Sequence, residues 1–595
     1  MKKIIYILLT GFFLLVSCTE DLLDRKPLDM VSDAQVWGDQ VLIDLYLTNA
    51  YLEMPILLNE TPDIDWASSE DWNGPFIINE ISDECKRNWI FGQATYIKNQ
   101  GIRINGGLLD WWEKSYKAIR TLNEFIERMP TAPVEEGFRT RRLAEARFLR
   151  AYNYFSMVKR YGGVPLITEA QALNAPEEEL YRSRDKEQVI YDFVISEMTA
   201  IAEDLPVKGQ TNYVYGRPTR HTALALKCRA ALYAGSIAQF GTVQLDGVVG
   251  INAPASGYYQ IAYDAASEIM SSGVYSLYNA DADKVVNFKN VFLKEDNVEV
   301  IWAKLHDYVQ RNLGGNGWIW DFFQCPKPHG WNAGNQNAPY LEMAEEFEYV
   351  DGTPGALNRA AIQTGVHSID EIWGNRDPRF YATIWTQNTP WQGTLVDFHN
   401  GLRLPDGSIL TSGAHEGVPA KGTQMVDNSF GTGFGVMKYL DENKSNMGER
   451  ATSGTDWQLF RYAEVLLNYA EAAFELGKTS DALSAINEIR SRAGIAPLTS
   501  IDRNKIYHER KVELAFEGHR YWDLRRWRLA EDELNINRSG LRYILDYETE
   551  NFQVQVIDRI DGTNENPRFL PENYYLPITT SRTGNNPNLV ENPGY

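Results

Sequence analysis

The stretch WQLFRYAEVLLNYAEAAFELGKTSDALSAINEIRSRAG, residues 457–494, decides the fold class. Apolar residues recur at three- and four-residue steps through its first half, which predicts a helix with one buried face. Gly477 is expected to end that helix. Ser480 is expected to N-cap a second helix over 481–494. Two helices joined by so short a turn predict one complete helical-repeat pair.

The same pattern occurs earlier in the chain. Apolar periodicity and helix-ending Pro and Gly residues predict five further helices, at 108–129, 141–163, 187–204, 219–239 and 258–272. Helices of this length, rich in Ala, Leu and Tyr, indicate repeats of tetratricopeptide type. We therefore expect a mainly α fold whose helical platform covers about 30–60, 108–275 and 457–530.

The middle of the chain has a different composition. Residues 280–455 are rich in Gly, Asn, Pro and Trp and have few long periodic runs, although VEVIWAKL (298–305) predicts a strand. Loops of this length that carry many aromatic residues are typical of functional, ordered segments. We expect one domain over 18–595. Its loop-rich lobe, with short strands, covers about 61–107 and 280–455, and an irregular C-terminal segment covers 531–595.

The stretch ERKVELAFEGHRYWDLRRW, residues 509–527, concentrates charge. On one helix Glu509, Glu513 and Glu517 would share a face. The arginines of the stretch could pair with these acids and with Asp523. Catalysis needs carboxylates that face each other across a cleft, which a single helix face does not provide. We interpret the stretch as scaffold.

Composition excludes several classes of function. The chain has 58 basic and 80 acidic residues, a formal charge of −22, so it would repel a phosphate backbone and is not expected to bind nucleic acid. Beyond Cys18, the cysteines Cys85, Cys228 and Cys325 lack zinc-site spacing. Cys228 lies in a helical pattern and is expected to be a core residue.

The N-terminus carries a targeting pattern. Lys2 and Lys3 precede an apolar run over 4–16, which is too short to span a bilayer but fits a secretory signal over 1–17. Small residues before Cys18 resemble a bacterial lipobox, which predicts lipidation of that thiol. The alternative is an ordinary signal peptide with a chance cysteine. A lipidated protein would be anchored to a membrane without spanning it.

Six separated segments carry a family resemblance. They are AEARFLRAYNYFSMVKRYGGVPLI (144–167), RPTRHTALALKCRAALYAG (217–235), WQLFRYAEVLLNYAEA (457–472), AINEIRSRAGIAPL (485–498), the stretch 509–527, and YYLPI with NPNLVENPGY inside 574–595. Together with the lipobox they resemble the SusD/RagB family of Bacteroidetes surface lipoproteins. Thr19-Glu20-Asp21 also resembles the surface-export signal of such lipoproteins.

The resemblance implies a specific biology. The family fold is a platform of about four tetratricopeptide-like helix pairs with an irregular lobe. Its members bind nutrients, mostly glycans, and sit as a lid over a SusC-type TonB-dependent transporter in the outer membrane, facing the cell exterior. It implies no catalytic residues and no cofactor. Some relatives hold a structural calcium ion, but the loop acids here lack EF-hand spacing, so the metal content stays open.

Tryptophans in the irregular segments suggest where a ligand binds. Sugars present apolar C–H faces and polar edges, so a sugar site needs flat aromatic platforms beside amide and charged groups. The alternative for each tryptophan is packing inside the loop core, or on the helical platform. The candidate ligand contacts are Trp72, Asn73, Arg87, Trp89, Tyr308, Trp318, Trp320, Trp331 and Asn332.

Three other functions remain open at this point. The same fold could bind peptides, as in the RagB-like branch. A surface glycoside hydrolase would need two opposed carboxylates, for which Asp71, Asp321 and Asp397 are available in loops. A purely structural lid would have no ligand affinity of its own.

Overall fold

The fold is described from a computed structural model of the chain. The described residues are 33–54, 77–87, 97–98, 102, 109–307, 318, 320–326, 336–423, 431–445, 447, 453–560 and 569–595.

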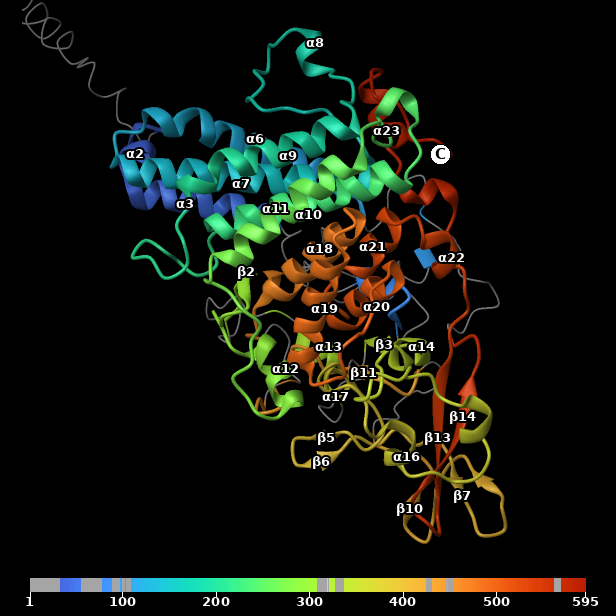
Figure 1. Ribbon diagram of the computed structural model, residues 1–595. Helices are drawn as coiled ribbons and strands as arrows, with labels where there is room; N and C mark the ends of the chain where they lie inside the picture. The colour runs from blue at the N-terminus through green and yellow to red at the C-terminus, as the bar shows by residue number, and fades with distance from the viewer. Residues whose placement is uncertain are drawn as a thin grey trace, which may run out of the picture.

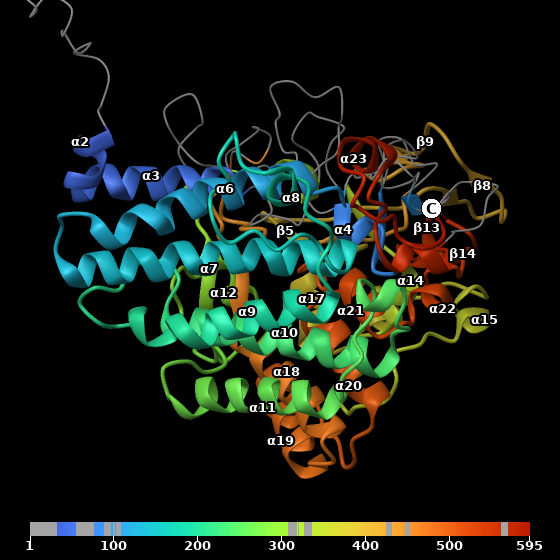
Figure 2. The same cartoon turned by 90° about the horizontal axis from the view of Figure 1, so that it is seen from above.

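A layered array of helices forms one side of the molecule (Figures 1 and 2). Its first helices are α3 (Gln40–Leu52), α6 (Trp112–Arg128), α7 (Glu136–Tyr161), α9 (Glu187–Ile201), α10 (Arg220–Phe240) and α11 (Ala255–Ser271). Each of these helices packs against the next one in this order. The expected helices are therefore present, within a few residues at each end. The arrangement confirms the mainly α, repeat-like fold.

The array continues across a long insertion. Helix α11 packs against α18 (Tyr462–Glu475), which packs against α19 (Thr479–Ala493) and α20 (Arg503–Glu513). The platform is thus built from segments on both sides of the lobe. The helix pair predicted from 457–494 is present, but the N-cap of α19 is Lys478 and not Ser480.

Residues 457–461 are a strand and not the start of a helix. This strand, β12 (Trp457–Arg461), pairs antiparallel with β2 (Val300–Lys304), which confirms the strand predicted at 298–305. All five residues of β12 are buried. A strand buried on both faces has no alternation, so its apolar run looked like a helical stripe.

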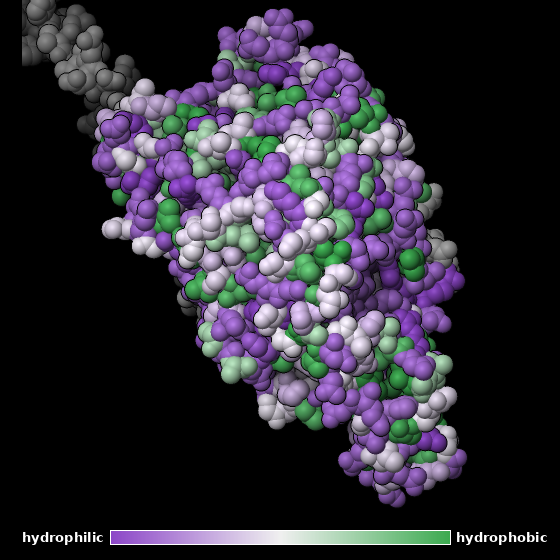
Figure 3. Space-filling view, viewed as in Figure 1, coloured by the Kyte–Doolittle hydropathy of each residue, from purple (hydrophilic) through white to green (hydrophobic). Residues whose placement is uncertain are grey.

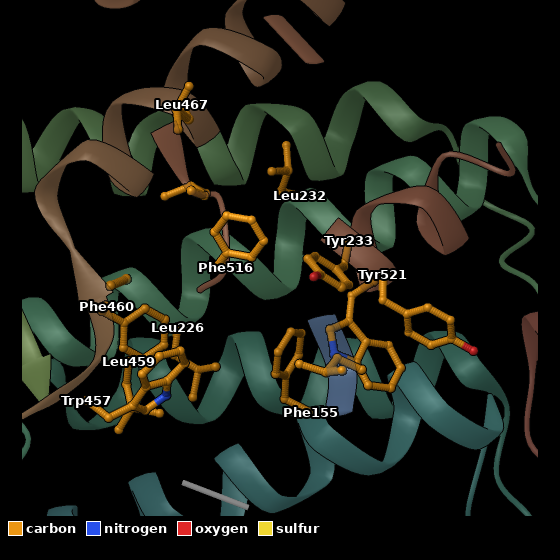
Figure 4. Packing of buried hydrophobic residues seen from close by; sticks show 14 of the residues in the cluster. Phe155, Leu226, Leu232, Tyr233, Trp457, Leu459, Phe460, Leu467, Phe516 and Tyr521 are labelled. Atoms are coloured by element: carbon orange, nitrogen blue, oxygen red, sulfur yellow. The ribbon is translucent and has the colours of Figure 1, made fainter. Parts of the chain in front are cut away.

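The core lies where α7 and α10 meet β12 and the C-terminal helices (Figure 4). The rings of Phe155 and Tyr233 lie edge to face at 5.3 Å. The guanidinium of Arg229 lies 3.9 Å from the ring centroid of Phe460. Cys228 is fully buried on α10, which confirms that it is a core residue. Aromatic rings therefore join α7 to α10, and α10 to β12 on the other side of the lobe.

The lobe consists of short elements. Its helices are α12 (Lys284–Leu293), α13 (Trp320–Gln324), α14 (Leu341–Glu345), α15 (Arg359–Ile362), α16 (Ile369–Trp373) and α17 (Pro378–Thr383). Its paired strands include β1 (Cys85–Arg87) with β3 (Asn337–Pro339), and β4 (Ile384–Trp385) with β11 (Gly435–Val436). Among the described residues, the largest sheet has four strands, in the order β14 (Phe552–Ile557), β13 (Gly540–Asp546), β7 (Leu402–Arg403) and β8 (Ile409–Leu410). Figure 1 shows this sheet at the end remote from the platform.

The C-terminal segment is more regular than expected. β13 (Gly540–Asp546) and β14 (Phe552–Ile557) form a hairpin that pairs with β7 (Leu402–Arg403) of the lobe. The expectation of an irregular segment is wrong for these residues. Phe552 and Val554 are buried on β14 and alternate with glutamines, which is the period-two signal of a half-buried strand.

The stretch 509–527 is two helices and not one. Helix α20 ends at Glu513, the chain turns through Phe516 (φ 60°) and Gly518 (φ 77°), and α21 covers Arg520–Arg526. Residues from a distant segment hold the turn. The amide N–H of Phe516 donates to Glu84 Oε1 at 2.9 Å, and the carbonyl of Phe516 accepts from Asn79 Nδ2 at 3.2 Å.

The carboxylates of this stretch form a buried ion network. Glu513 contacts Arg379 at 2.9 Å, Arg461 at 2.6 Å and also Arg492. Arg461 also binds Glu517 at 2.7 Å. The expected pairing within the stretch holds for Arg510 and Arg526, which bind Asp523. The network joins α20 to α17, β12 and α19, so the stretch is scaffold.

A buried carboxyl on α9 makes stability depend on pH. Glu187 accepts hydrogen bonds from Gly250 N at 2.6 Å and Tyr575 Oη at 2.8 Å, and burial raises its pKa to about 7. A raised carboxyl pKa favours the protonated folded state. The contribution of the Glu187 carboxyl to folding stability is therefore complete below about pH 4.5 and is lost as pH rises through about 7.

We expect Glu187→Gln to make the free energy of unfolding less dependent on pH between 5 and 8, by up to about 3 kcal/mol. Urea denaturation of both proteins at pH 5 and pH 8 measures this difference. If the free energy of unfolding changed equally with pH in the two proteins, Glu187 would be ionised in the folded state at neutral pH, which contradicts the prediction.

Candidate ligand-binding site

Most of the predicted ligand contacts lie outside the described residues. These are Trp72, Asn73, Trp89, Tyr308, Trp331 and Asn332, together with the predicted lipidation site Cys18. They stay predictions. The structure places only the segments that flank them in the chain.

The other three predicted contacts are buried. Arg87 lies on β1, opposite Asn337, and is 4% exposed. Trp318 pairs with Ser453, and the indole N–H of Trp320 donates to the carbonyl of Lys438 at 2.8 Å. Trp320 is wholly buried and Trp318 is 4% exposed. These three side chains therefore pack within the lobe, and their assignment as ligand contacts stays a prediction.

The two tryptophans belong to a stack of rings. The ring of His306 lies 4.9 Å from that of Trp318, which lies 5.6 Å from that of Trp320, and both pairs are within 14° of parallel. His306 follows the end of β2, and Trp320 begins α13. The stack fixes the positions at which the chain enters and leaves residues 308–317.

A polar cavity of about 450 Å³ opens beside this stack. Its walls come from the ends of β2 and α12, the start of α13, and β12. Residue 307, at its edge, directly precedes Tyr308, one of the predicted contacts. The lining residues are Tyr215, Phe292, Leu293, Lys294, Glu295, His306, Asp307, Asp321, Asp441, Lys444, Gly454, Thr455, Asp456 and Gln458.

Asp456 is held at the base of the cavity. Its carboxylate accepts hydrogen bonds from His306 N and from Tyr215 Oη, both at 2.8 Å. Burial raises the pKa of Asp456 to about 6. The carboxyl is thus fixed in position but close to its protonation range at neutral pH.

Two other side chains present unused acceptors. Asp321 binds Lys444 Nζ through Oδ2 at 2.6 Å, and burial raises its pKa. The side-chain amide of Gln458 donates to the carbonyl of Val291 at 2.5 Å. Among the described residues, Asp321 Oδ1 and Gln458 Oε1 have no hydrogen-bond partner. Both oxygens are buried from solvent, so they lie unpaired inside the wall and are not open to the cavity.

Two of the three loop carboxylates that a hydrolase could use have basic partners. Asp321 is ion-paired with Lys444, and Asp397 lies 2.7 Å from His399 Nδ1. Asp71 lies outside the described residues. Within the described ranges, His, Cys, Asp and Glu side chains form no cluster that could hold a metal ion.

Sequence reasoning missed Asp456, Gln458 and Tyr215. A glutamine inside the apolar stretch 457–460 and an aspartate directly before it were the available signals. Their meeting with residues 306 and 321 depends on the pairing of β2 with β12.

A second cavity, of about 400 Å³, lies on the platform between α6 and the C-terminal residues. Trp112, Glu113, Tyr116, Arg182 and Arg582 are among its lining residues. It shares no lining residue with the polar cavity. Its residues therefore provide matched control positions.

The surface gives two further facts. On the face drawn in Figure 3, hydrophobic residues are scattered among polar ones. In the part of the chain that the structure describes, no helix has the length and apolar character needed to cross a bilayer.

The fold and cavity define a helical-repeat binding protein with an inserted lobe. Residues 298–595 match the model of the SusD family, and residues 63–232 match a model described as starch-binding associating with outer membrane. The chain belongs to the SusD family, which confirms the resemblance found in its sequence.

Individual relatives cover nearly the whole chain. SusD-like protein P38 of Formosa agariphila is 23% identical over 558 residues, which are 88% of this chain and 92% of that protein. Starch-binding protein SusD of Bacteroides thetaiotaomicron is 24% identical over 97% of this chain and 96% of that protein. The structure of a SusD-like protein of Bacteroides fragilis superposes with a TM-score of 0.73 at 25% identity, over 96% of this chain and 100% of that structure. A SusD-like carbohydrate binding protein of the same species superposes with a TM-score of 0.69 at 22% identity, over 93% of this chain and 100% of that structure.

Proposed function

We propose that the protein captures glycan chains at the cell surface and delivers them to a TonB-dependent outer-membrane transporter, without making or breaking a covalent bond. The observation that carries the proposal is the polar cavity beside the ring stack, which is lined by carboxylate, hydroxyl and amide side chains. Family membership supports it, because one relative is named a starch-binding protein.

The chemistry of the cavity suits a saccharide. Each sugar hydroxyl can donate one hydrogen bond and accept others, and the carboxylates of Glu295 and Asp441 are among the acceptors that line the cavity. Tyr215 and Phe292 add aromatic surface to the same walls. The predicted platforms Trp72, Trp89 and Trp331 would extend the site, with Tyr308 closing the arc.

The test is retention of the protein by a polysaccharide panel in affinity gel electrophoresis. We expect wild type to be retarded by at least one glycan. The double substitution Glu295→Ala and Asp441→Ala, at lining residues that are not buried, should weaken that binding about tenfold, since it removes about two hydrogen bonds. Arg182→Ala, on the second cavity, should bind as wild type does.

Two results would contradict this proposal. If the folded cavity variant binds as wild type does, the cavity is not the glycan site. If no polysaccharide retards wild type, glycan capture is excluded, and peptides or a lid without its own ligand become the better account.

Membrane attachment is tested separately. We propose that Cys18 carries the lipid anchor that holds the protein on the outer membrane, facing the exterior. Cys18→Ala should move most of the protein from the membrane to the soluble fraction and abolish labelling with a radioactive fatty acid. Surface protease should digest wild type on intact cells. An unchanged membrane fraction would exclude the anchor.

A further inference from the structure

We infer that one exposed face of α3 contacts the lipid surface of the membrane that bears the anchor. This inference rests on the proposed function, because it takes the lipid on Cys18 as the point of attachment. The face consists of Val41, Leu45, Thr48 and Leu52, which we call the α3 stripe.

The α3 stripe lies opposite the buried face of its helix. Helix α3 packs against α6 and α7, and its buried residues are Ile43, Leu47 and Ala50. The members of the stripe follow at steps of four, three and four residues, which places them together on the other side. Val41 is 67% exposed, Leu45 58% and Leu52 70%. A helix that is apolar on both sides has a second surface to cover.

The other end of the helical array gives a comparison. In the packing order of the described helices, α3 comes first and α19 lies at the far end, as Figure 2 shows. The terminal helices of such an array need a polar outer face to stay soluble. Helix α19 has one, because its exposed residues at similar steps are Ser480, Ser484, Glu488 and Ser491. The apolar outer face of α3 departs from this rule, so we expect a partner to cover it.

Polar groups beside the stripe are already engaged. The Asp39 carboxylate accepts from Val41 N at 2.7 Å and caps the helix. Arg142 binds the Asp44 carboxylate through two nitrogens, one of them at 3.2 Å. The hydroxyl of Thr48 donates to the carbonyl of Asp44 at 2.7 Å. The stripe can therefore leave water without unpairing these groups.

The position and size of the stripe favour lipid as the partner. Cys18 precedes Asp33, the first residue of α2 (Asp33–Gly38), by 15 residues, which span at most about 50 Å. A tether of this length keeps α3 near the membrane, so a weak contact is enough to hold it there. A stable protein interface buries roughly 800 Å² on each partner, far more than four side chains of one helix supply. Lipid contact needs only the insertion of apolar side chains.

A fluorescent label beside the stripe tests the inference. Asn49 is exposed on α3, and Cys85, Cys228 and Cys325 are buried, so Asn49→Cys can be labelled selectively with an environment-sensitive dye. The lipidated protein is reconstituted into vesicles of phosphatidylethanolamine and phosphatidylglycerol that contain a nitroxide-bearing lipid. We expect the nitroxide to quench this label at least fivefold more than the same label on Ser484→Cys, the control on α19.

Substitutions in the stripe locate the effect. Val41→Ser, Leu45→Ser and Leu52→Ser together should reduce quenching of the Asn49→Cys label to the level of the α19 control. The melting temperature should stay unchanged, because all three side chains are exposed. Val189→Ser and Val286→Ser, at exposed positions of α9 and α12, should leave the quenching as it is.

The inference and the anchor fail in different ways. Equal quenching on α3 and α19, in protein that floats with the vesicles, overturns the lipid contact and leaves the anchor standing. An emission shift typical of an apolar environment without nitroxide quenching also overturns it, since a protein such as a second copy of this chain then covers the stripe. Protein that does not float with the vesicles contradicts both the anchor and the contact.

Discussion

Glu513→Gln is expected to lower the free energy of unfolding by about 3 kcal/mol, because it removes a buried charge that three guanidinium groups share, although each of them keeps at least one other carboxylate. Glu513 is fully buried and binds three arginines, Arg379, Arg461 and Arg492. The amide of glutamine is nearly the same size, so the loss comes from charge and not from a cavity. Urea denaturation at pH 7 measures it.

The same network predicts acid sensitivity. Burial alone would raise the pKa of Glu513, but Arg492, Arg461 and Arg379 together hold it well below its usual range. A lowered carboxyl pKa stabilises the folded state above about pH 4.5, and that contribution is lost as pH falls toward the folded-state pKa. The stability difference between wild type and Glu513→Gln should therefore narrow in acid.

An exposed glutamate gives the control. Glu178→Gln, on the surface helix α8 (Glu177–Leu180), should change the free energy of unfolding by less than about 0.5 kcal/mol. A loss below about 1 kcal/mol for Glu513→Gln would mean that the network relaxes around the amide, which contradicts its role as rigid scaffold.

Gly163→Ala is expected to destabilise the protein by about 3 kcal/mol or more. A Cβ atom at this position would lie 1.8 Å from the carbonyl oxygen of Asp185 and 3.0 Å from the amide nitrogen of Glu187. Both are backbone atoms, so neither can move aside as a side-chain tip could. Gly163 also donates to Val248 O at 2.7 Å, which fixes its own backbone. Overpacking of this kind costs stability through backbone shifts.

Gly257 is the control position for Gly163→Ala. It lies in α11, and a Cβ there would meet nothing within 4 Å. Gly257→Ala should raise stability by about 0.5–1 kcal/mol, since alanine favours the helix. Thermal denaturation of both variants compares them. Equal melting temperatures for Gly163→Ala and wild type would contradict the close approach of the two segments.

The helical platform could be predicted from the sequence because its signal is local. Apolar periodicity places α7, α10 and α11 within a few residues of their observed ends. Apolar periodicity does not identify an element whose two faces are both buried. Residues 457–461 are all buried although they include Gln458 and Arg461, so they show no alternation, and their pairing with β2 makes them a strand.

The stretch 509–527 shows a second kind of failure. Its local pattern favours one helix, yet Asn79 and Glu84 hold the turn at Phe516 from more than 400 positions away in the chain. The partners of Glu513 are equally remote, since Arg379 precedes it by 134 residues. Carboxylate spacing predicted a scaffold but could not identify the arginines that complete it.

Composition alone could not separate platform tryptophans from core tryptophans. Trp318 and Trp320 lie among loop residues but stack inside the lobe. The cavity beside them combines residues from before and after the lobe's central loops, such as Tyr215 and Asp456. Their contact depends on tertiary packing, which no single stretch of sequence records.

Hydrogen exchange with and without a retained glycan tests the central claim most directly. The full-length protein in detergent should show ligand-induced protection at residues 292–295, 303–307 and 453–458, which border the polar cavity. Residues 112–123 and 582–589, at the second cavity, should exchange at unchanged rates. Protection confined to that second cavity, or no change in either region while the glycan is bound, would contradict glycan capture at the polar cavity.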